Sequence, residues 1–244
     1  MSLSLGSTDI GSMYAGGRKI AEAWLGSSKV FGGAAPVEGV TIGSRTYSTV
    51  TIGNQVWMAE NLDWKFSDLT FRDGVDGNEI TNNVNLAQAA YYDYDESTYG
   101  VNGNKYGLLY NWTAVDYINN HLSALGVPSD WHVPTHAEWT ALVSAVGEDS
   151  GTKLKSTTGW SSGAGTDDYG FSAVPTGDWN NGFIDIGFYA YFWTSEPSGS
   201  DAWCRFVYSG KNVQKRIQYR YHGFSVRLVK SLSNTDDDYI GGGI

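Results

Sequence analysis

Cysteine is almost absent from this chain of 244 residues, which contains only Cys204. A single cysteine excludes both an internal disulfide and a cysteine-based zinc site. Long apolar runs are absent too, because no stretch approaches the roughly 20 apolar residues that a membrane-spanning helix needs. The first 17 residues, MSLSLGSTDIGSMYAGG, lack the basic start and long apolar core of a secretory signal. We therefore expect a fold stabilised by packing, without membrane insertion and without a signal peptide in this chain.

Basic residues are also few, since 16 Lys and Arg stand against 26 Asp and Glu, a formal net charge of −10. This balance argues against a nucleic-acid partner, which would require a wider basic surface. Yet Ser200–Lys230 holds seven basic residues and one acidic residue, a local charge of +6 (7 − 1). The segment leaves nucleic-acid binding as a minor alternative. Its interleaved aromatic residues are typical of a contact surface, where rigid rings bury area and arginine supplies directional donors.

The sequence predicts an α+β fold in which two helices lie among short antiparallel strands and long loops. The high content of Gly (31) and Tyr (16) favours strands and loops over helices. Residues 67–106 are polar and rich in Gly, Asn and Asp, and we expect them to form long surface loops. Strand-like patterns occur at 40–42, 47–52, 55–59, 171–174, 190–194, 202–208, 212–219 and 224–229.

One helix is strongly indicated after Pro134. Thr135 and Glu138 have the spacing of a capping box, in which each side chain satisfies a backbone N–H of the other. The apolar stripe behind it consists of Trp139, Leu142, Val143 and Val146, and Gly147 ends it. A second, weaker helix is predicted over 109–125, with these side chains inward: Trp112, Val115, and Ile118 or Leu122.

The first part of the chain contains a short repeat. Residues 14–20 (YAGGRKI) and 24–30 (WLGSSKV) each place an aromatic residue, a Gly-containing turn, a Lys and a β-branched residue in the same order. This pattern predicts short strands or hairpin arms, which form either an attachment segment or an edge hairpin of the main domain. We divide the chain into an attachment segment with linker (1–36), a main domain (37–231) and an acidic, Gly-rich tail (232–244).

Six ordered blocks of the main domain resemble a known family. They are 51–62 (TIGNQVWMAENL), 106–112 (YGLLYNW), 131–139 (WHVPTHAEW), 170–175 (GFSAVP), 191–195 (YFWTS) and 223–227 (GFSVR). In this order they are similar to the Fibrobacter succinogenes major paralogous domain family. The resemblance implies a C-type-lectin-like fold, which is shared with the formylglycine-generating enzymes and with the variable proteins of diversity-generating retroelements. In those variable proteins, the diversified residues lie just before the closing strand, which here corresponds to 202–222.

The resemblance also implies which side chains contact a ligand. The family pattern places Trp203, Arg205 and Val207 on the inner face of a strand, so the alternate residues should point outward. The predicted contact residues are Cys204, Phe206, Tyr208, Gln214, Lys215, Ile217, Gln218, Arg220 and His222. The alternative is a surface hairpin with aromatic cross-strand pairs and no ligand.

Catalytic patterns are weak in this chain. Ser161 lies in a G-x-S-x-G match, but a loop-like sequence follows where a nucleophile elbow requires a helix. His132 and His136 have the spacing of a zinc pair, yet Pro134 and the Thr135 cap keep His132 outside the helix. Formylglycine-generating chemistry depends on cysteines that the lone Cys204 does not supply. We expect no enzymatic activity, no catalytic residue and no metal site.

No cofactor is expected, although carboxylate clusters leave Ca²⁺ as a minor alternative. These clusters lie at 73–79, 93–96, 167–168 and 236–238, and none has the spacing of an EF-hand loop. We therefore interpret these clusters as solvent-exposed charges on loops. The glycosylation sequon at Asn111 falls inside a family block and is interpreted as structural.

The sequence therefore predicts a non-enzymatic binding module. We expect a phage tail or other virion receptor-binding protein, or a retroelement-diversified variable protein, that contacts a host surface protein or glycan. Residues 1–33 would attach it to a tail structure or form a homo-oligomer. One alternative is a domain of a bacterial cell-surface or secreted adhesin that binds carbohydrate, which would place it outside the cell. Another is an enzyme of the formylglycine-generating or related oxygenase type.

Overall fold

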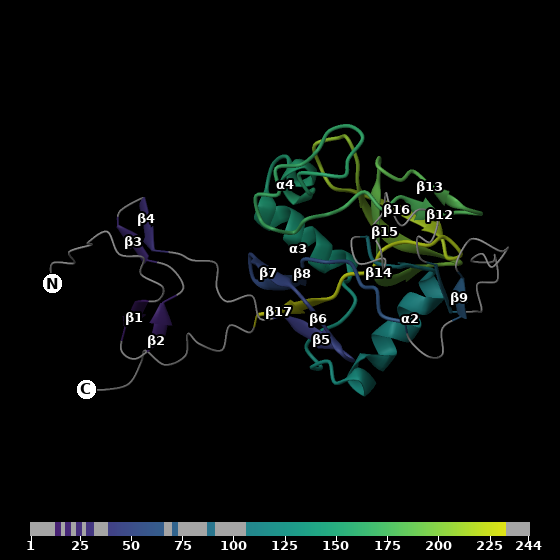
Figure 1. Cartoon of the computed structure of the whole chain (residues 1–244), viewed down its shortest axis with the longest axis horizontal. Coiled ribbons are helices and arrows are strands. Elements are labelled where there is room, and N and C mark those ends of the chain that lie inside the picture. The colour runs from purple at the N-terminus through teal and green to yellow at the C-terminus, as the bar shows by residue number, and fades with distance from the viewer. Residues whose placement is uncertain are drawn as a thin grey trace. The chain divides into compact units, whose positions relative to one another are not determined.

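Figure 1 shows a computed structural model of the whole chain. It describes residues 39–65, 87 and 106–232 with their side chains, and the backbone of six short strands at 13–15, 18–20, 23–25, 28–31, 70–72 and 88–90. The chain divides into two compact units, Met1–Glu38 and Gly39–Ile244. The acidic tail and most of residues 67–106, for which we predicted loops, lie outside the described residues.

The described residues of the first unit form two antiparallel strand pairs. β1 (Met13–Ala15) pairs with β2 (Arg18–Ile20), and β3 (Ala23–Leu25) pairs with β4 (Ser28–Phe31). Each copy of the short repeat thus corresponds to one strand pair, as its turn residues predicted.

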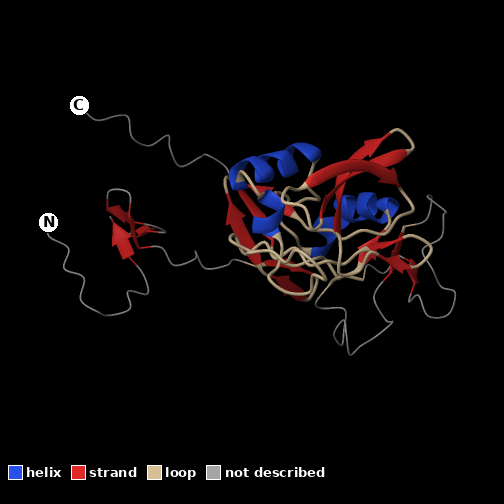
Figure 2. Ribbon diagram, turned by 90° about the horizontal axis from the view of Figure 1, so that it is seen from above, coloured by secondary structure: helices blue, strands red, loops and turns tan. Residues whose placement is uncertain are grey.

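The second unit is an α+β domain whose central sheet lies between two helices. Strands β14 (Ala190–Ser198), β15 (Asp201–Val207) and β16 (Gln214–Tyr219) pair antiparallel in the order β14-β15-β16. One face packs with helix α2 (Trp112–His121) and the other with helix α3 (His136–Val146). Because β14 and β15 are apolar on both faces, they can be buried only in such a sandwich. Figure 2 shows these helices and strands from above.

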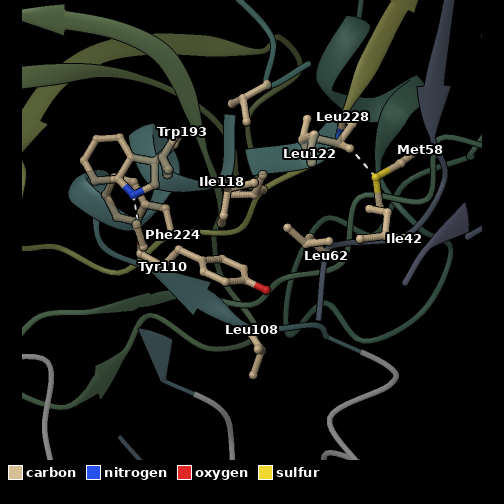
Figure 3. Close-up of a cluster of buried hydrophobic side chains, with 14 of the residues drawn as sticks. Ile42, Met58, Leu62, Leu108, Tyr110, Ile118, Leu122, Trp193, Phe224 and Leu228 are labelled. Carbon is tan, nitrogen blue, oxygen red and sulfur yellow. Dashed lines mark hydrogen bonds between the residues drawn. The ribbon is translucent and has the colours of Figure 1, made fainter. Parts of the chain in front are cut away.

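Helix α2 begins three residues later than predicted. Leu109–Tyr110 forms strand β11, and the side chain of Asn111 caps the helix by accepting from the Ala114 N–H at 3.0 Å. A 3₁₀ turn, η1 (Leu122–Leu125), extends the helix to the predicted end. The predicted inward residues are all buried: Trp112, Val115, Ile118 and Leu122. Figure 3 shows Ile118 and Leu122 inside the core cluster.

Helix α3 has the predicted capping box. Thr135 accepts from the Glu138 N–H at 3.2 Å, and the Glu138 carboxylate accepts from the Thr135 N–H at 2.8 Å. Trp139, Leu142 and Val146 are buried, and Val143 packs at the margin of the same cluster. Gly147 ends the helix at a positive φ of 76°, which favours glycine. The short helix α4 (Ser150–Leu154) follows and was not predicted.

The two ends of the domain meet in a second sheet. β8 (Gln55–Met58) lies between β7 (Thr49–Ile52) and the late strand β17 (Val229–Ser231), and both pairings are antiparallel. β5 (Val40–Ile42) and β6 (Arg45–Tyr47) form a hairpin before it. The remaining strands are β9 (Thr70–Arg72) and β10 (Gln88–Ala90), which join β11, and the pair β12 (Asp178–Trp179) and β13 (Phe183–Ile184).

Two predicted strands are wrong, at 171–174 and at 224–228. Ser172 has a φ of +52°, which interrupts an extended conformation. The segment 224–228 is extended but bonds to several neighbours in turn, so it has no single partner strand. Its Phe224 N–H donates to Tyr110 at 3.0 Å, whereas its Leu228 carbonyl accepts from Met58 at 3.0 Å.

Candidate ligand-binding surface

The basic, aromatic segment forms β15, β16 and the connection between them. The register pairs Cys204 with Arg216 and Arg205 with Lys215. Because alternate residues of a strand point to opposite faces, the hairpin has two distinct surfaces. We call them the α2 face and the α3 face after the helix on each side. The α2 face carries Ala202, Cys204, Phe206, Gln214, Arg216 and Gln218. The α3 face carries Trp203, Arg205, Val207, Lys215, Ile217 and Tyr219.

The predicted outward position of Cys204 is wrong. Its side chain is fully buried in the core cluster that contains α2, because the sheet is covered on both faces. Desolvation by burial raises the pKa of the Cys204 thiol to about 12, so the sulfur stays protonated at neutral pH. Phe206, on the same face, is half-buried against that cluster. Of the predicted inner residues, Arg205 and Val207 are buried and Trp203 is half-exposed.

His222 is also buried, which contradicts its assignment as a contact residue. Its Nδ1 lies 3.0 Å from the Asp178 carboxylate, and both side chains are almost completely inaccessible to solvent. The ring centroids of Tyr221 and Phe224 lie 5.0 and 5.8 Å from that of His222. The residue therefore anchors the end of the hairpin inside the domain.

Arg220 is half-buried and bonds within the chain. Its Nε donates to the Asp201 carbonyl at 3.2 Å, and its Nη2 donates to the Gly199 carbonyl at 2.9 Å. The guanidinium also lies over the ring of Trp112, 4.4 Å from its centroid. Arg220 thus joins the β14–β15 turn to helix α2. Two of its five N–H donors are therefore already used by the protein itself.

The other predicted contact residues are accessible, but they belong to different surfaces. Gln214 is exposed and Gln218 half-exposed on the α2 face. Lys215 and Ile217 are exposed on the α3 face, where 43% of Ile217 is accessible. Phe206 and Tyr208 share the α2 face with the two glutamines, so a small ligand on one face would meet either these four residues or Lys215 and Ile217, but not the whole predicted set.

The α2 face carries an aromatic cluster that the sequence prediction captured only in part. Tyr189 stacks on Tyr191 (centroids 5.3 Å apart, planes at 3°) and on Tyr208 (5.8 Å, 8°). Phe206 contacts Tyr208 at 5.9 Å. The guanidinium of Arg216 lies 5.1 Å from the Tyr191 centroid and 5.3 Å from the Phe206 centroid. We call Tyr189, Phe206, Tyr208 and Arg216 the Tyr–Arg patch.

Arg216 and Tyr189 were missed by the prediction. Arg216 is exposed and lies in the basic segment Ser200–Lys230, between the predicted contact residues Lys215 and Ile217. Counting alternate positions from Phe206 across the register would have placed it on the same face. Tyr189 lies outside the segment, just before β14, so no pattern in 200–230 could have included it.

An acidic side chain borders the Tyr–Arg patch. The Tyr191 hydroxyl donates to the Asp185 carboxylate at 3.4 Å. Burial raises the pKa of Asp185, and the charge of Asp178 adds to the effect, whereas the charge of Arg216 opposes it. Burial likewise raises the pKa of Tyr191 well above its usual value. Both hydroxyl and ring of Tyr191 are therefore fixed beneath the patch.

Two of the seven basic residues in Ser200–Lys230 are buried structural groups rather than contact residues. Arg205 Nη2 donates to the His136 carbonyl at 3.0 Å and to the Thr140 hydroxyl at 2.7 Å, both on α3. Arg227 Nε donates to Asn61 at 2.7 Å, and its other nitrogens donate to the carbonyls of Met58, Phe171 and Ser172. Desolvation by burial lowers the pKa of Arg227 to about 9.

The start of helix α3 lies between His132 and His136, the two histidines that have the spacing of a zinc pair. His132 precedes α3, and its Nε2 lies 2.6 Å from the Glu138 carboxylate. The ring of His136 lies against Trp203, with centroids 5.0 Å apart. In the part of the chain that the structure describes, no group of three or more His, Cys, Asp or Glu side chains could hold a metal ion.

The other candidate sites have ordinary surroundings. Ser161 lies in an irregular loop, where its N–H donates to the Gly187 carbonyl at 2.8 Å. Asp167 accepts from the N–H of Ser172 at 2.7 Å and also from its hydroxyl. The acidic clusters at 73–79, 93–96 and 236–238 lie outside the described residues. Among the described helices, none has the length and apolarity to cross a membrane.

Comparison with known protein families identifies where this chain belongs. Residues 50–230 match the family model described as the Fibrobacter succinogenes major domain, which covers most of the chain. The chain belongs to this family. The six sequence blocks from which the resemblance was drawn lie within the matched range, and they include both the α3 capping box and the Arg227 motif. In this major domain the Tyr–Arg patch and β16 lie inside the matched region. No curated protein and no solved structure matched the chain.

Proposed function

We propose that this major domain is a non-enzymatic binding module with a C-type-lectin-like fold, and that it contacts its ligand through the Tyr–Arg patch. The observation that carries the proposal is the position of Arg216, an exposed residue whose guanidinium lies over the rings of Tyr191 and Phe206. Arginine and tyrosine supply most of the binding energy at many interfaces. A stacked guanidinium keeps its orientation, so it loses little conformational freedom when it donates to a ligand.

The surroundings of the patch support this proposal. Tyr189 and Tyr208 stack in nearly parallel planes, which limits their rotation before any ligand binds. The core beneath is filled by large side chains, including Trp193 and Phe224, whose ring centroids lie 4.4 Å apart (Figure 3). The exposed side chains of β16 can therefore change without disturbing the packing that holds the sheet. This separation suits a surface that is diversified by a retroelement.

For the biological role, we propose attachment of a phage tail or other virion to a host cell. The ligand would be a surface protein or a glycan of the host, and the strand pairs of residues 1–33 would attach the domain to the tail or form an oligomer. The second candidate is a bacterial cell-surface or secreted adhesin, which the same Tyr–Arg patch would serve. An enzyme of the formylglycine-generating type is less favoured, because burial keeps the Cys204 thiol protonated.

The experiment is a binding assay with fluorescently labelled protein on a panel of candidate bacterial host cells. We expect the variant Tyr208→Ala/Arg216→Ala to lose at least about tenfold in cell-bound signal, because two interface residues of this kind contribute about 1–2 kcal/mol or more each. The matched control is Lys211→Ala/Leu232→Ala, which removes one exposed cation and one exposed apolar side chain elsewhere. Equal signals from both variants and the wild type would contradict the proposal. Thermal unfolding of each variant verifies that the fold is retained.

A further inference from the structure

The outer edge of β16 has no partner strand among the described residues. β16 is the last strand in the order β14-β15-β16, and within that part of the chain it pairs with β15 alone. Within the described residues, the outward main-chain groups of Lys215 and Ile217 make no hydrogen bond, whereas the Tyr219 carbonyl at the end of the strand accepts from the His222 N–H at 3.1 Å. A strand edge with unpaired N–H and C=O groups is a template for another strand.

The hydrogen bonds of β14 show how the backbone groups of the sheet are oriented. The Trp193 N–H donates to the Ser225 carbonyl, and the Ser225 N–H donates to the Tyr191 carbonyl, both at 3.1 Å. Tyr191 and Trp193 therefore direct their main-chain groups away from β15. Because consecutive residues of a strand direct these groups to opposite edges, Phe192 faces β15 and bonds with its partner Arg205.

The same alternation identifies the outward groups of β16. Since Arg205 faces β14, the preceding Cys204 faces β16, where its partner is Arg216. Arg216 therefore bonds to β15, and its neighbours Lys215 and Ile217 direct their N–H and C=O groups outward. A side-chain hydrogen bond supports this assignment. The Thr194 hydroxyl of β14 donates to the Trp203 carbonyl at 3.0 Å, so Trp203, like Arg205, directs its main-chain groups towards β14.

The side chains along this edge combine apolar surface with positive charge. Ile217 and Tyr219 are 43% and 56% exposed on the α3 face. Lys215 lies on the same face, with its Nζ 5.9 Å from the ring centroid of Trp203. Arg216 projects from the opposite face. A strand added here would face the apolar side chains of Ile217 and Tyr219 and the cationic side chains of Lys215 and Arg216.

We propose that β16 accepts an extended, acidic segment of a partner protein as a fourth, antiparallel strand of the sheet. Peptides commonly bind in this way to exposed sheet edges, where the main chain provides affinity and alternate side chains provide specificity. This inference rests on the proposed binding function and deepens it by naming the partner's chemistry. A second copy of the chain suits the edge poorly, because pairing β16 with itself would bring its two adjacent cations, Lys215 and Arg216, next to those of the other copy.

The test uses the acetylated and amidated heptapeptide TVTVEET as the probe, with TVTVKKT as the control, on ¹⁵N-labelled full chain. In the antiparallel register its valines lie opposite Tyr219 and Ile217, and its glutamates lie opposite Arg216 and Lys215. Amide hydrogen exchange measured by NMR should slow about tenfold or more at the Lys215 and Ile217 N–H groups when the acidic peptide is near saturation. The exchange of Arg216, already bonded to β15, should not change, and the basic peptide should have no effect.

Several outcomes would overturn the inference. They are the absence of protection at Lys215 and Ile217, equal protection by both peptides, and protection that rises with protein concentration alone, which would make a second copy the occupant. None of these outcomes bears on the loss of cell binding in the Tyr208→Ala/Arg216→Ala variant, so the two proposals fail separately.

A pair of variants separates main-chain pairing from side-chain contact. Ile217→Pro removes the outward N–H without touching the β15 ladder, and proline is tolerated on an edge whose N–H faces solvent. Ile217→Ala removes the side chain and keeps the N–H. We expect Ile217→Pro to abolish peptide binding and Ile217→Ala to weaken it only a few-fold. Equal losses would contradict strand addition, and the exchange measurement on the unmodified chain does not depend on the folding of either variant.

Discussion

At the residue scale, Arg227 shows that a basic side chain can serve the fold rather than a ligand. It is fully buried and donates to one side-chain amide and three main-chain carbonyls, with its guanidinium 4.3 Å from the ring centroid of Phe171. The carbonyls of Phe171 and Ser172 belong to a segment that is not a regular strand. Arg227 therefore replaces the ladder partners that this segment lacks.

Replacing Arg227 should destabilise the domain strongly. In Arg227→Met, the buried carbonyls lose a charged donor, and we expect the free energy of unfolding to fall by about 3 kcal/mol or more. Urea denaturation followed by tryptophan fluorescence measures this loss. The exposed Lys211→Ala serves as the comparison, because surface substitutions usually change stability by about 0.5 kcal/mol or less. A loss for Arg227→Met as small as that of Lys211→Ala would contradict the structural role.

The contact residues could be predicted from the sequence only in part. Period-two alternation separates the faces of a strand, but it does not show whether a second layer covers the outer face. Cys204 lies on the face predicted to be outward, yet helix α2 covers that face. His222 is a polar residue whose partner, Asp178, is 44 positions away in the chain, so no local pattern reveals its burial.

At the scale of elements, the segments with strong local signals were predicted well. The start of α3 was readable because the capping box, the apolar stripe and the final glycine all lie within about a dozen residues. The segment 224–228 was misread as a strand because its partners come from segments distant in the chain. Its apolar alternation reflects burial among Tyr110, Tyr191 and Met58 rather than a ladder.

The α3 cap should make stability depend on pH. The hydrogen bond to Glu138 raises the pKa of His132, although burial opposes the effect. Burial would raise the pKa of Glu138, but the hydrogen bonds from His132 and Thr135 together lower it. The His132 contribution is therefore complete below its unfolded pKa of about 6.5 and is lost as pH rises through its raised folded pKa. The Glu138 contribution is lost as pH falls through its lowered pKa.

The His132→Gln variant tests this dependence. Glutamine can still donate to Glu138 but does not titrate, so the stability difference between wild type and variant should be largest near pH 6 and should shrink towards pH 8. Thermal unfolding at half-unit pH steps measures the difference. A difference that stays constant from pH 5.5 to 8.5 would show that the pair does not titrate as described.

At the scale of the whole molecule, the two compact units suggest separate tasks. Deleting residues 1–33 should remove oligomerisation or particle association and leave the unfolding transition of the major domain unchanged. Size-exclusion chromatography with light scattering, together with thermal unfolding, measures both properties. Unchanged assembly after the deletion would contradict the attachment role of the strand pairs.

The central claim is that the basic segment divides into buried bases that hold the fold and an exposed Arg216 that binds. The most direct test reverses one charge, Arg216→Glu, and compares its binding to host cells with that of the wild type. The account predicts a loss of at least about tenfold in cell-bound signal, with an unfolding midpoint close to that of the wild type. Full binding by the folded Arg216→Glu variant would contradict it.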